Sequence, residues 1–243
     1  MKRRSEQLIK KFVLIIMFSL IIAFTGCVYK PYYHPGYMGS QPAPILNSPT
    51  GGNTNYLGGT INYESESKKN EESVLGKLLF QRNHTYRYGS FSYHTEMFAG
   101  YHLIEAIEEK AGEKLNYYGF APQLSGSLFY LLKESRLGFY GYTGMFWEFG
   151  KYDDWMDEAE EAELIWKELE DFNGKKLFGG GGFLFEHIID EKSMLSFKFG
   201  AGLPGLIHIM TNYQKGSNIY VLNIGINEIS ESSSVSFGYM RAW

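Results

Sequence analysis

The chain has 243 residues, one cysteine, a formal net charge of −4 and an aromatic content of 17%. One cysteine excludes disulfide bonds within the chain and metal sites built from several thiolates. A net-acidic chain without a basic patch is a poor nucleic-acid binder, so we expect no nucleic-acid partner.

The first residues have the order of a secretory signal. Basic residues between Lys2 and Lys11 precede an apolar run from Phe12 to Phe24, and Thr25-Gly26-Cys27 follows that run. A helix over the run would span about 20 Å, less than the ~30 Å hydrocarbon core of a bilayer. We therefore predict that residues 1–26 are a cleaved signal peptide rather than a permanent transmembrane helix.

The sequence Phe24-Thr25-Gly26-Cys27 resembles the lipobox of bacterial lipoproteins, although Phe24 stands where that family usually has leucine. The resemblance implies that Cys27 becomes the first residue of the mature chain. Its sulfur would carry diacylglycerol and its amine usually an acyl chain such as palmitate, so membrane lipid is the expected partner. Val28 replaces the aspartate of the family's inner-membrane retention signal, which implies an outer-membrane location.

Residues 27–84 are predicted to be a flexible tether between the lipid and the folded domain. The segment contains Pro31, Pro35, Pro42, Pro44, Pro49 and the pair Gly51-Gly52. Such a composition is typical of a spacer. Within it we expect at most two short elements, a strand over 57–63 and a helix over 73–80.

Residues 85–243 are predicted to form one β-barrel domain, because apolar and polar residues alternate there with a period of two. In 194–202, for example, Leu195, Phe197 and Phe199 alternate with serine, lysine and glycine. Similar alternation occurs in 90–102, 218–227 and 234–243. Successive side chains of a strand point to opposite faces of the sheet, so each segment has one apolar face.

Alternation does not reveal which face meets water. A soluble barrel encloses its apolar face, whereas a membrane barrel turns that face to lipid and encloses small and polar groups. Glycines such as Gly200, Gly225 and Gly238 lie on the polar face, and aromatic residues gather on the other. This pattern favours a barrel that spans the membrane.

The C-terminal strand resembles that of small outer-membrane β-barrel proteins of the OmpA and OmpX type. Ser236, Gly238 and Trp243 match their final-strand pattern, while Arg241 stands where an aromatic residue is expected. The resemblance implies that Gly238 and Trp243 belong to a signal recognised by the outer-membrane assembly machinery.

We predict an antiparallel up-and-down barrel of about eight strands with both termini at the periplasmic side. Tight connections are expected near 133–135, 190–192 and 214–217, and long ones over 104–114 and 151–175. Short periplasmic and long external connections are typical of membrane barrels. The predicted strands are 85–103, 115–132, 136–149, 176–189, 193–202, 206–213, 218–228 and 233–243.

The segment 153–171 is strongly acidic and is predicted to be an amphipathic helix at the rim of the barrel. Trp155, Ala159, Ala162, Trp166 and Leu169 recur at helical spacing. Trp155 and Trp166 could anchor a partner protein. Alternatively, both tryptophans dock onto the barrel itself.

Several ionisable residues fall on the enclosed face of the predicted strands. We expect a polar network in the barrel interior, in which opposite charges satisfy one another, formed by His94, Glu96, His102, Glu186 and Lys198. A metal site is the less favoured interpretation of the same residues. The glycine run 179–182 lacks the Lys-Ser/Thr of a phosphate loop, and we interpret it as a bend or as room for a large neighbour such as Tyr140.

The sequence contains no spacing typical of a catalytic site, and we expect neither enzymatic activity nor a cofactor. We therefore predict a lipid-anchored outer-membrane barrel with a structural or interaction role, not an open pore. The alternative is a periplasm-facing lipoprotein with a soluble, lipocalin-like barrel that binds a small apolar ligand. An apolar residue on both faces of 137–149 supports that alternative, while the absence of the lipocalin Gly-x-Trp motif weakens it.

Overall fold

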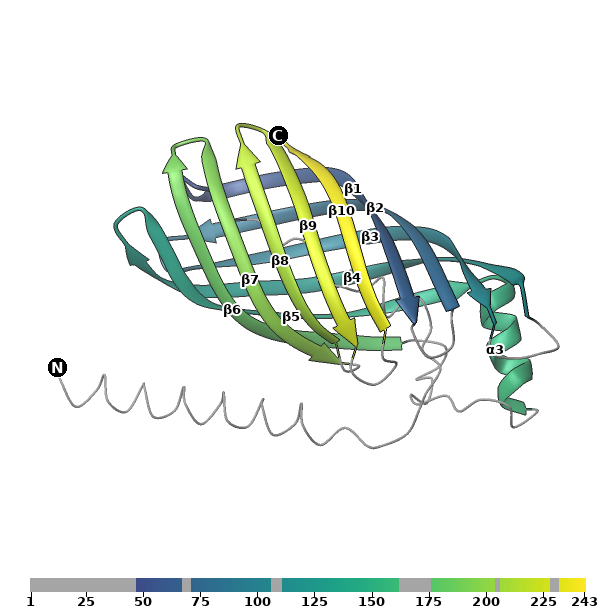
Figure 1. Cartoon of the computed structure of the whole chain (residues 1–243). Coiled ribbons are helices and arrows are strands. Elements are labelled where there is room, and N and C mark those ends of the chain that lie inside the picture. Colours follow the sequence, from purple (N-terminus) through teal and green to yellow (C-terminus); the bar gives the residue numbers. More distant parts are fainter. Residues whose placement is uncertain (1–46, 67–70, 106–110, 162–175, 204–205, 228–231) are drawn as a thin grey trace.

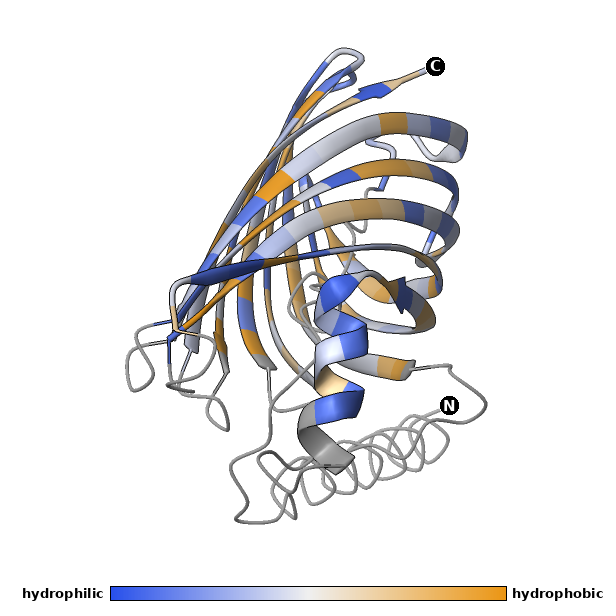
Figure 2. Cartoon of the chain, turned by 90° about the vertical axis from the view of Figure 1, so that its right-hand side faces the viewer, coloured by the Kyte–Doolittle hydropathy of each residue, from blue (hydrophilic) through white to orange (hydrophobic). Residues whose placement is uncertain are grey.

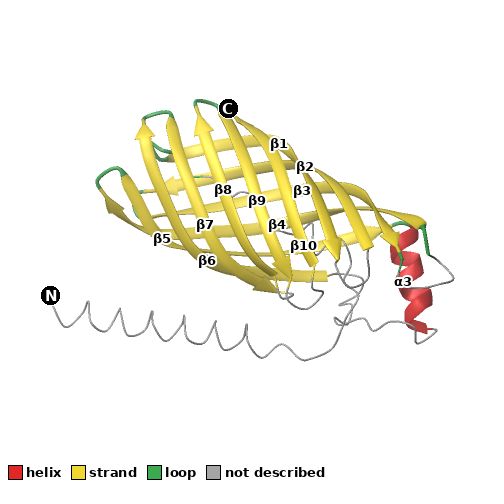
Figure 3. Ribbon diagram, in the orientation of Figure 1, coloured by secondary structure: helices red, strands yellow, loops and turns green. Residues whose placement is uncertain are grey.

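The computed structural model describes residues 47–66, 71–105, 111–161, 176–203, 206–227 and 232–243. These residues form ten strands and one helix (Figures 1 and 3). The signal peptide, Cys27, the first part of the tether and Trp166 lie outside the described residues. The elements are β1 Gly52–Glu66, β2 Glu71–Tyr86, β3 Gly89–Ile104, β4 Glu113–Leu132, β5 Ser135–Phe149, α3 Lys151–Glu161, β6 Lys176–Asp190, β7 Ser193–Leu203, β8 Leu206–Lys215, β9 Asn218–Asn227 and β10 Ser232–Ala242.

Each strand pairs antiparallel with its neighbours in the sequence, and β1 pairs with β10 to close the barrel. The closure extends to the last residue, since Asn55 and Trp243 exchange two backbone hydrogen bonds of 3.3 and 3.1 Å. Closure leaves no strand edge unpaired. The all-β, antiparallel, up-and-down barrel predicted from the alternation is thus confirmed.

The number of strands is a correction, since the barrel has ten strands rather than about eight. The eight predicted strands correspond to β3 to β10. The missing pair, β1 and β2, occupies residues 52–86, most of which were assigned to the tether, and the helix expected over 73–80 is part of β2. On β2 both faces mix apolar and polar residues, so the sequence shows no period of two there.

The two ends of the barrel differ in their connections. Tight turns after β2, β4, β6 and β8 lie at one end, together with the C-terminus, and we call this the short-turn end. The connections after β1, β3, β5, β7 and β9 lie at the other end, which carries α3 (Figure 1). The predicted separation of tight and long connections is confirmed, with 206–215 forming a strand as the topology required.

The apolar face of each strand points outward. Phe197 and Phe199 on β7 are 44% and 47% exposed, whereas Lys198 between them is only 1% exposed. Leu195, Ile224 and Phe237 are exposed as well. Apolar and polar colours alternate along the strands in Figure 2, as expected for two faces of different polarity.

Large apolar side chains form two buried clusters in the interior, and the smaller cluster joins β1, β2, β8, β9 and β10. A buried cluster from β2 to β6 includes Phe98, Tyr117, Phe146 and Phe178. Tyr140 and Tyr142 point inward beside glycines of β6 and β7, and a Cβ atom on Gly202 would lie 2.3 Å from the Tyr142 hydroxyl. The glycines therefore make room for the tyrosines, as expected for the run 179–182.

Helix α3 covers part of the end opposite the short turns. Tyr152 and Met156 are fully buried and Trp155 is 6% exposed, all within the same cluster as Tyr117. The Tyr152 ring lies 4.9 Å from the His102 ring of β3. Trp155 therefore docks onto the chain's own barrel, and its assignment to a partner surface is corrected.

The glycine sector gives a direct test of this packing. A Cβ atom on Gly182 would lie 2.1 Å from the Phe199 carbonyl oxygen, whereas one on the outward Gly76 meets nothing closer than 3.8 Å. We expect Gly182→Ala to lower the free energy of unfolding by about 1–3 kcal/mol because the strands must separate to fit the methyl group. Urea unfolding in detergent measures this, with Gly76→Ala as the matched control. Equal stability of the two variants would contradict the close approach of β6 and β7.

Candidate functional site in the barrel interior

The interior of the barrel carries charged side chains in three separate groups. The first group joins β2 and β3: Lys77 Nζ donates to Glu96 Oε2 at 2.9 Å, and His94 Nε2 lies 3.7 Å from Glu96 Oε1. All three side chains are buried. A buried charge is stable only when it is paired, so the diagonal contact of Lys77 on β2 with Glu96 on β3 keeps both ions inside the barrel.

The second group lies toward the end that carries α3. His102 Nε2 is 3.3 Å from Glu71 Oε2, and the other carboxylate oxygen of Glu71 accepts the backbone N–H of Glu105 at 3.3 Å. The contact of His102 with Tyr152 brings α3 into this group. It therefore links the ends of β2 and β3 to the helix above them.

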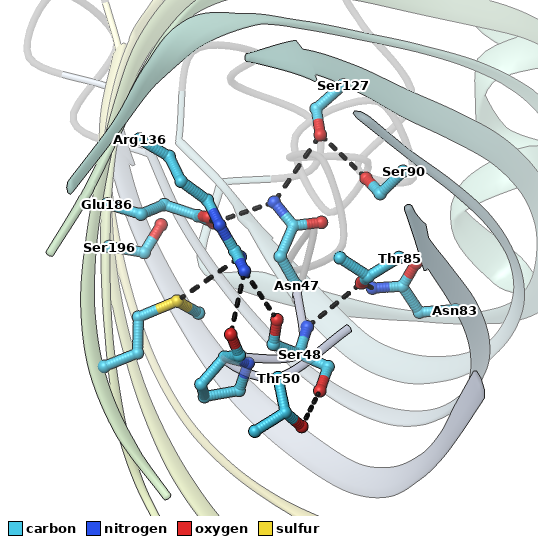
Figure 4. Close-up of polar contacts among 12 residues, drawn as sticks. Asn47, Ser48, Thr50, Asn83, Thr85, Ser90, Ser127, Arg136, Glu186 and Ser196 are labelled. Atoms are coloured by element: carbon cyan, nitrogen blue, oxygen red, sulfur yellow. Dashed lines mark hydrogen bonds and ion pairs between the residues drawn. The ribbon is translucent and has the colours of Figure 1, made fainter. Parts of the chain in front are cut away.

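The third group lies at the short-turn end and includes residues that precede β1 (Figure 4). Arg136 Nη1 on β5 donates to Glu186 Oε2 on β6 at 3.2 Å. Arg136 Nη2 donates to the carbonyl oxygens of Ser48 and Pro49 at 3.0 and 2.9 Å. Glu186 Oε1 accepts the side-chain amide of Asn47 at 2.8 Å.

The segment from Asn47 to Gly51 thus begins inside the barrel, where Asn47 and Ser48 are buried, and reaches the surface at the exposed Thr50. Asn47 is fully buried and reaches toward Ser127 of β4, and the Ser48 backbone N–H donates to Thr85 Oγ1 of β2 at 3.0 Å. Gly51 and Gly52 then have positive φ angles of 83° and 87°, a conformation that favours glycine. These two residues turn the chain into the first strand.

Lys198 stands between the aromatic cluster and the third group. Its ammonium donates to Ser196 Oγ of the same strand at 2.8 Å. The neighbouring strand β8 contributes His208, whose Nε2 is hydrogen-bonded to the Tyr140 hydroxyl. These contacts connect the polar interior with the tyrosines over the glycine sector.

Some interior polar groups have no partner in the described part of the chain. Gln81 and Gln123 lie on either side of His94 in the strand register, and both amide atoms of Gln81 are buried without a hydrogen bond, whereas Gln123 contacts the His94 ring. Burying such atoms is costly unless water reaches them. The wall formed by β2, β3 and β4 is therefore suited to contact with water.

The structure places all five residues of the expected interior network on the enclosed face, but it does not bring them together. His94 and Glu96 form one group with Lys77, His102 belongs to another, and Glu186 belongs to a third. Lys198 has no direct ion pair among the described residues. Opposite charges are paired within each group rather than across the whole interior.

Sequence analysis missed the partners of these groups. Lys77, Glu71 and Asn47 all lie in residues 27–84, which were assigned to the tether. Arg136 could have been found, because it shares the inward face of β5 with Gly138 and Tyr140. Among the described residues, no group of three or more His, Cys, Asp or Glu is placed to hold a metal ion.

Comparisons with known proteins return similar folds only. No protein-family model matches the chain, and no curated protein sequence is significantly similar to it. Among solved structures, an outer membrane channel from Pseudomonas putida F1 covers 84% of this chain and 99% of its own, with 8% identity and a TM-score of 0.42. The translocator domain of the autotransporter NalP from Neisseria meningitidis matches over 79% of this chain and 88% of its own length, with 10% identity and a TM-score of 0.43. OprG from Pseudomonas aeruginosa covers 80% and 97%, with 8% identity and a TM-score of 0.40.

Removal of one charge should reveal the interior pairing. We expect Glu96→Ala to lower the free energy of unfolding by about 3–5 kcal/mol, because Lys77 is left buried without a counter-ion. In the double variant Lys77→Met/Glu96→Leu, which leaves no unpaired charge, the free energy of unfolding should fall much less. The control is Glu134→Ala in an exposed turn, for which we expect the free energy of unfolding to change by about 0.5 kcal/mol or less. A cost for Glu96→Ala no larger than that of the control would show that the pair is solvated.

Proposed function

We propose that this chain is a lipid-anchored outer-membrane β-barrel protein with a structural or interaction role in the cell envelope, not an open pore. The observation that carries the proposal is the outward apolar face. Leu195, Phe197, Ile224 and Phe237 are between 41% and 62% exposed, while Lys198 and Glu186 are enclosed. In water this arrangement would be strongly unfavourable, whereas in a bilayer it is the stable one.

The distribution of exposed aromatic residues supports a membrane position. Tyr213, Tyr220 and Tyr239 lie side by side on β8, β9 and β10 near the short-turn end. Tyr86, Tyr88, Tyr130 and Trp243 are exposed at the same end. Tyr63, Tyr101 and Tyr118 are exposed toward the other end of their strands. Two aromatic girdles on either side of an aliphatic and phenylalanine band match the two interfaces of a bilayer.

Strand length fits the same position. Strands β7 to β10 have 10 or 11 residues, which is the length needed to cross a bilayer when tilted. Strands β2 to β5 have 15 to 20 residues and extend further on the side of α3 (Figure 1). If short turns face the periplasm, this extension and α3 face outward.

The interaction role rests on this outer extension. Asp154, Asp157 and Glu158 on α3 are exposed, while Tyr152 and Met156 fix the helix to the barrel. The helix is therefore a rigid element that presents carboxylates beyond the bilayer. Assembly into the membrane would use Gly238 and Trp243 of β10, where Trp243 is exposed and completes the closure with Asn55.

The lipid anchor at Cys27 is supported by the lipobox-like sequence Phe24-Thr25-Gly26-Cys27. The short-turn end carries the C-terminus and the start of β1, so an anchor and a barrel can both occupy one membrane. No helix in the described residues has the length and apolar character to cross a membrane. The soluble, lipocalin-like alternative is not favoured, because the residues that it places in a dry centre are exposed.

Electrophoresis of unboiled samples tests the proposal. We expect the folded barrel to persist in dodecyl sulfate and to migrate differently from the boiled chain, since membrane barrels have closed hydrogen bonding and an apolar exterior. Cys27→Ser should keep this shift but lose incorporation of radiolabelled palmitate. Identical migration of boiled and unboiled samples would contradict the proposed membrane barrel. Palmitate incorporation by Cys27→Ser would contradict the proposed lipid anchor at Cys27.

A further inference from the structure

The segment Asn47–Gly51, which we call the internal segment, fills space that the barrel side chains leave free. Ten strands make a wider barrel than eight, because the diameter grows with the number of strands. At the short-turn end, β2 and β3 contribute small polar side chains to the interior, among them Thr85 and Ser90, and β4 contributes Ser127 together with the larger, buried Phe129. The internal segment lies against these walls and crosses to β5 and β6 (Figure 4).

The internal segment is held in the barrel by hydrogen bonds, which can break and form again. Arg136 holds two of its carbonyl oxygens and Glu186 holds the Asn47 amide, while no apolar side chain of the segment joins the buried clusters. If the segment leaves, Arg136 and Glu186 remain paired with each other at 3.2 Å. The barrel wall therefore keeps its charge balance without the segment.

The wall beyond the internal segment is polar. Gln81 of β2 presents amide atoms that make no hydrogen bond, and Ser92 of β3 and Ser125 of β4 present hydroxyls without a partner among the described residues. On the other side of the interior, β7, β9 and β10 carry small inward residues such as Gly200 and Ser236, but a second buried cluster also places Ile219, Val221 and Met240 there. The aromatic cluster occupies only the side from β2 to β6.

We infer that the internal segment is a removable plug, and that its displacement opens an aqueous path for inorganic ions and other small polar solutes through the barrel. The inference rests on the proposed membrane-spanning barrel and adds a gated transport activity to it. Water would satisfy the amide of Gln81 in the open state. Arg136, Glu186 and Lys198 place both signs of charge along the path, so selection between cations and anions is weak.

Planar bilayers in potassium chloride test the inference with the full-length protein. Asn47→Asp places a carboxylate beside Glu186 and weakens the seat of the plug without changing the wall. We expect an open time about tenfold longer than that of the wild type, equivalent to ~1.4 kcal/mol. Asn218→Asp is the matched control at the same end, because Asn218 is exposed and its Oδ1 accepts from Tyr239, which a carboxylate also does. The control should conduct as the wild type does.

A crosslink distinguishes displacement of the plug from damage to the barrel. The Ser48 backbone N–H lies 3.0 Å from Thr85 Oγ1, so Ser48→Cys and Thr85→Cys in the Asn47→Asp background should form a disulfide under oxidation. Oxidation should abolish the added conductance and a reductant should restore it. Added conductance that persists after disulfide formation would overturn the inference that the internal segment is a plug.

A second variant guards against failure of the first. Replacement of Asn47 and Ser48 together by glycine removes the two buried side chains of the plug and should also increase conductance. If both variants are as silent as the wild type, the inference is overturned, because a segment that neither change releases is a fixed part of the fold. Retention of the electrophoretic shift in these variants would leave the proposed membrane barrel standing even then.

Discussion

The alternation of side chains between two media is the constraint on which the rest of this structure depends. On a strand, neighbouring residues must point to opposite faces, so every outward phenylalanine is followed by an inward residue. Phe197 and Phe199 face outward with Lys198 enclosed between them. Closure of β1 on β10 makes the constraint complete, because no strand edge is left through which the polar interior could meet lipid.

Enclosure of polar residues creates the second problem, which is how to satisfy them without bulk water. The structure uses two solutions. Charges are paired across neighbouring strands, as in Lys77 with Glu96 and Arg136 with Glu186. The remaining space is filled by tyrosines packed over glycines, by α3 at one end and by the residues before β1 at the other. A wider, ten-stranded barrel makes the last of these necessary, since small side chains such as Ser90 and Ser127 do not reach across it.

The sequence predicted the parts of the fold in which one face is purely apolar. In β7, β9 and β10 the alternation is regular, and both the strands and the enclosed position of Lys198 follow from it. The prediction from the sequence failed for β2. Leu75 and Leu79 point inward there while Leu78 and Phe80 point outward, so that no period of two appears. The enclosed face of each predicted strand could be derived in this way, but the grouping of its charges could not. Partners such as Lys77 and Glu96 are set by the strand register, which local patterns do not reveal. Trp155 shows the same limit, because helical spacing does not decide whether a tryptophan faces a partner or its own barrel.

Fluorescence quenching along β7 tests the outward apolar face most directly. Single cysteines at Leu195, Ser196, Phe197, Lys198 and Phe199, introduced with Cys27→Ser and carrying a fluorophore, can be compared in proteoliposomes. Quenchers attached to lipid chains should reach positions 195, 197 and 199 and not 196 and 198, so that quenching alternates with a period of two. Lipid quenching at 196 and 198 alone, or the same quenching at all five positions, would contradict a barrel with its apolar face in the bilayer.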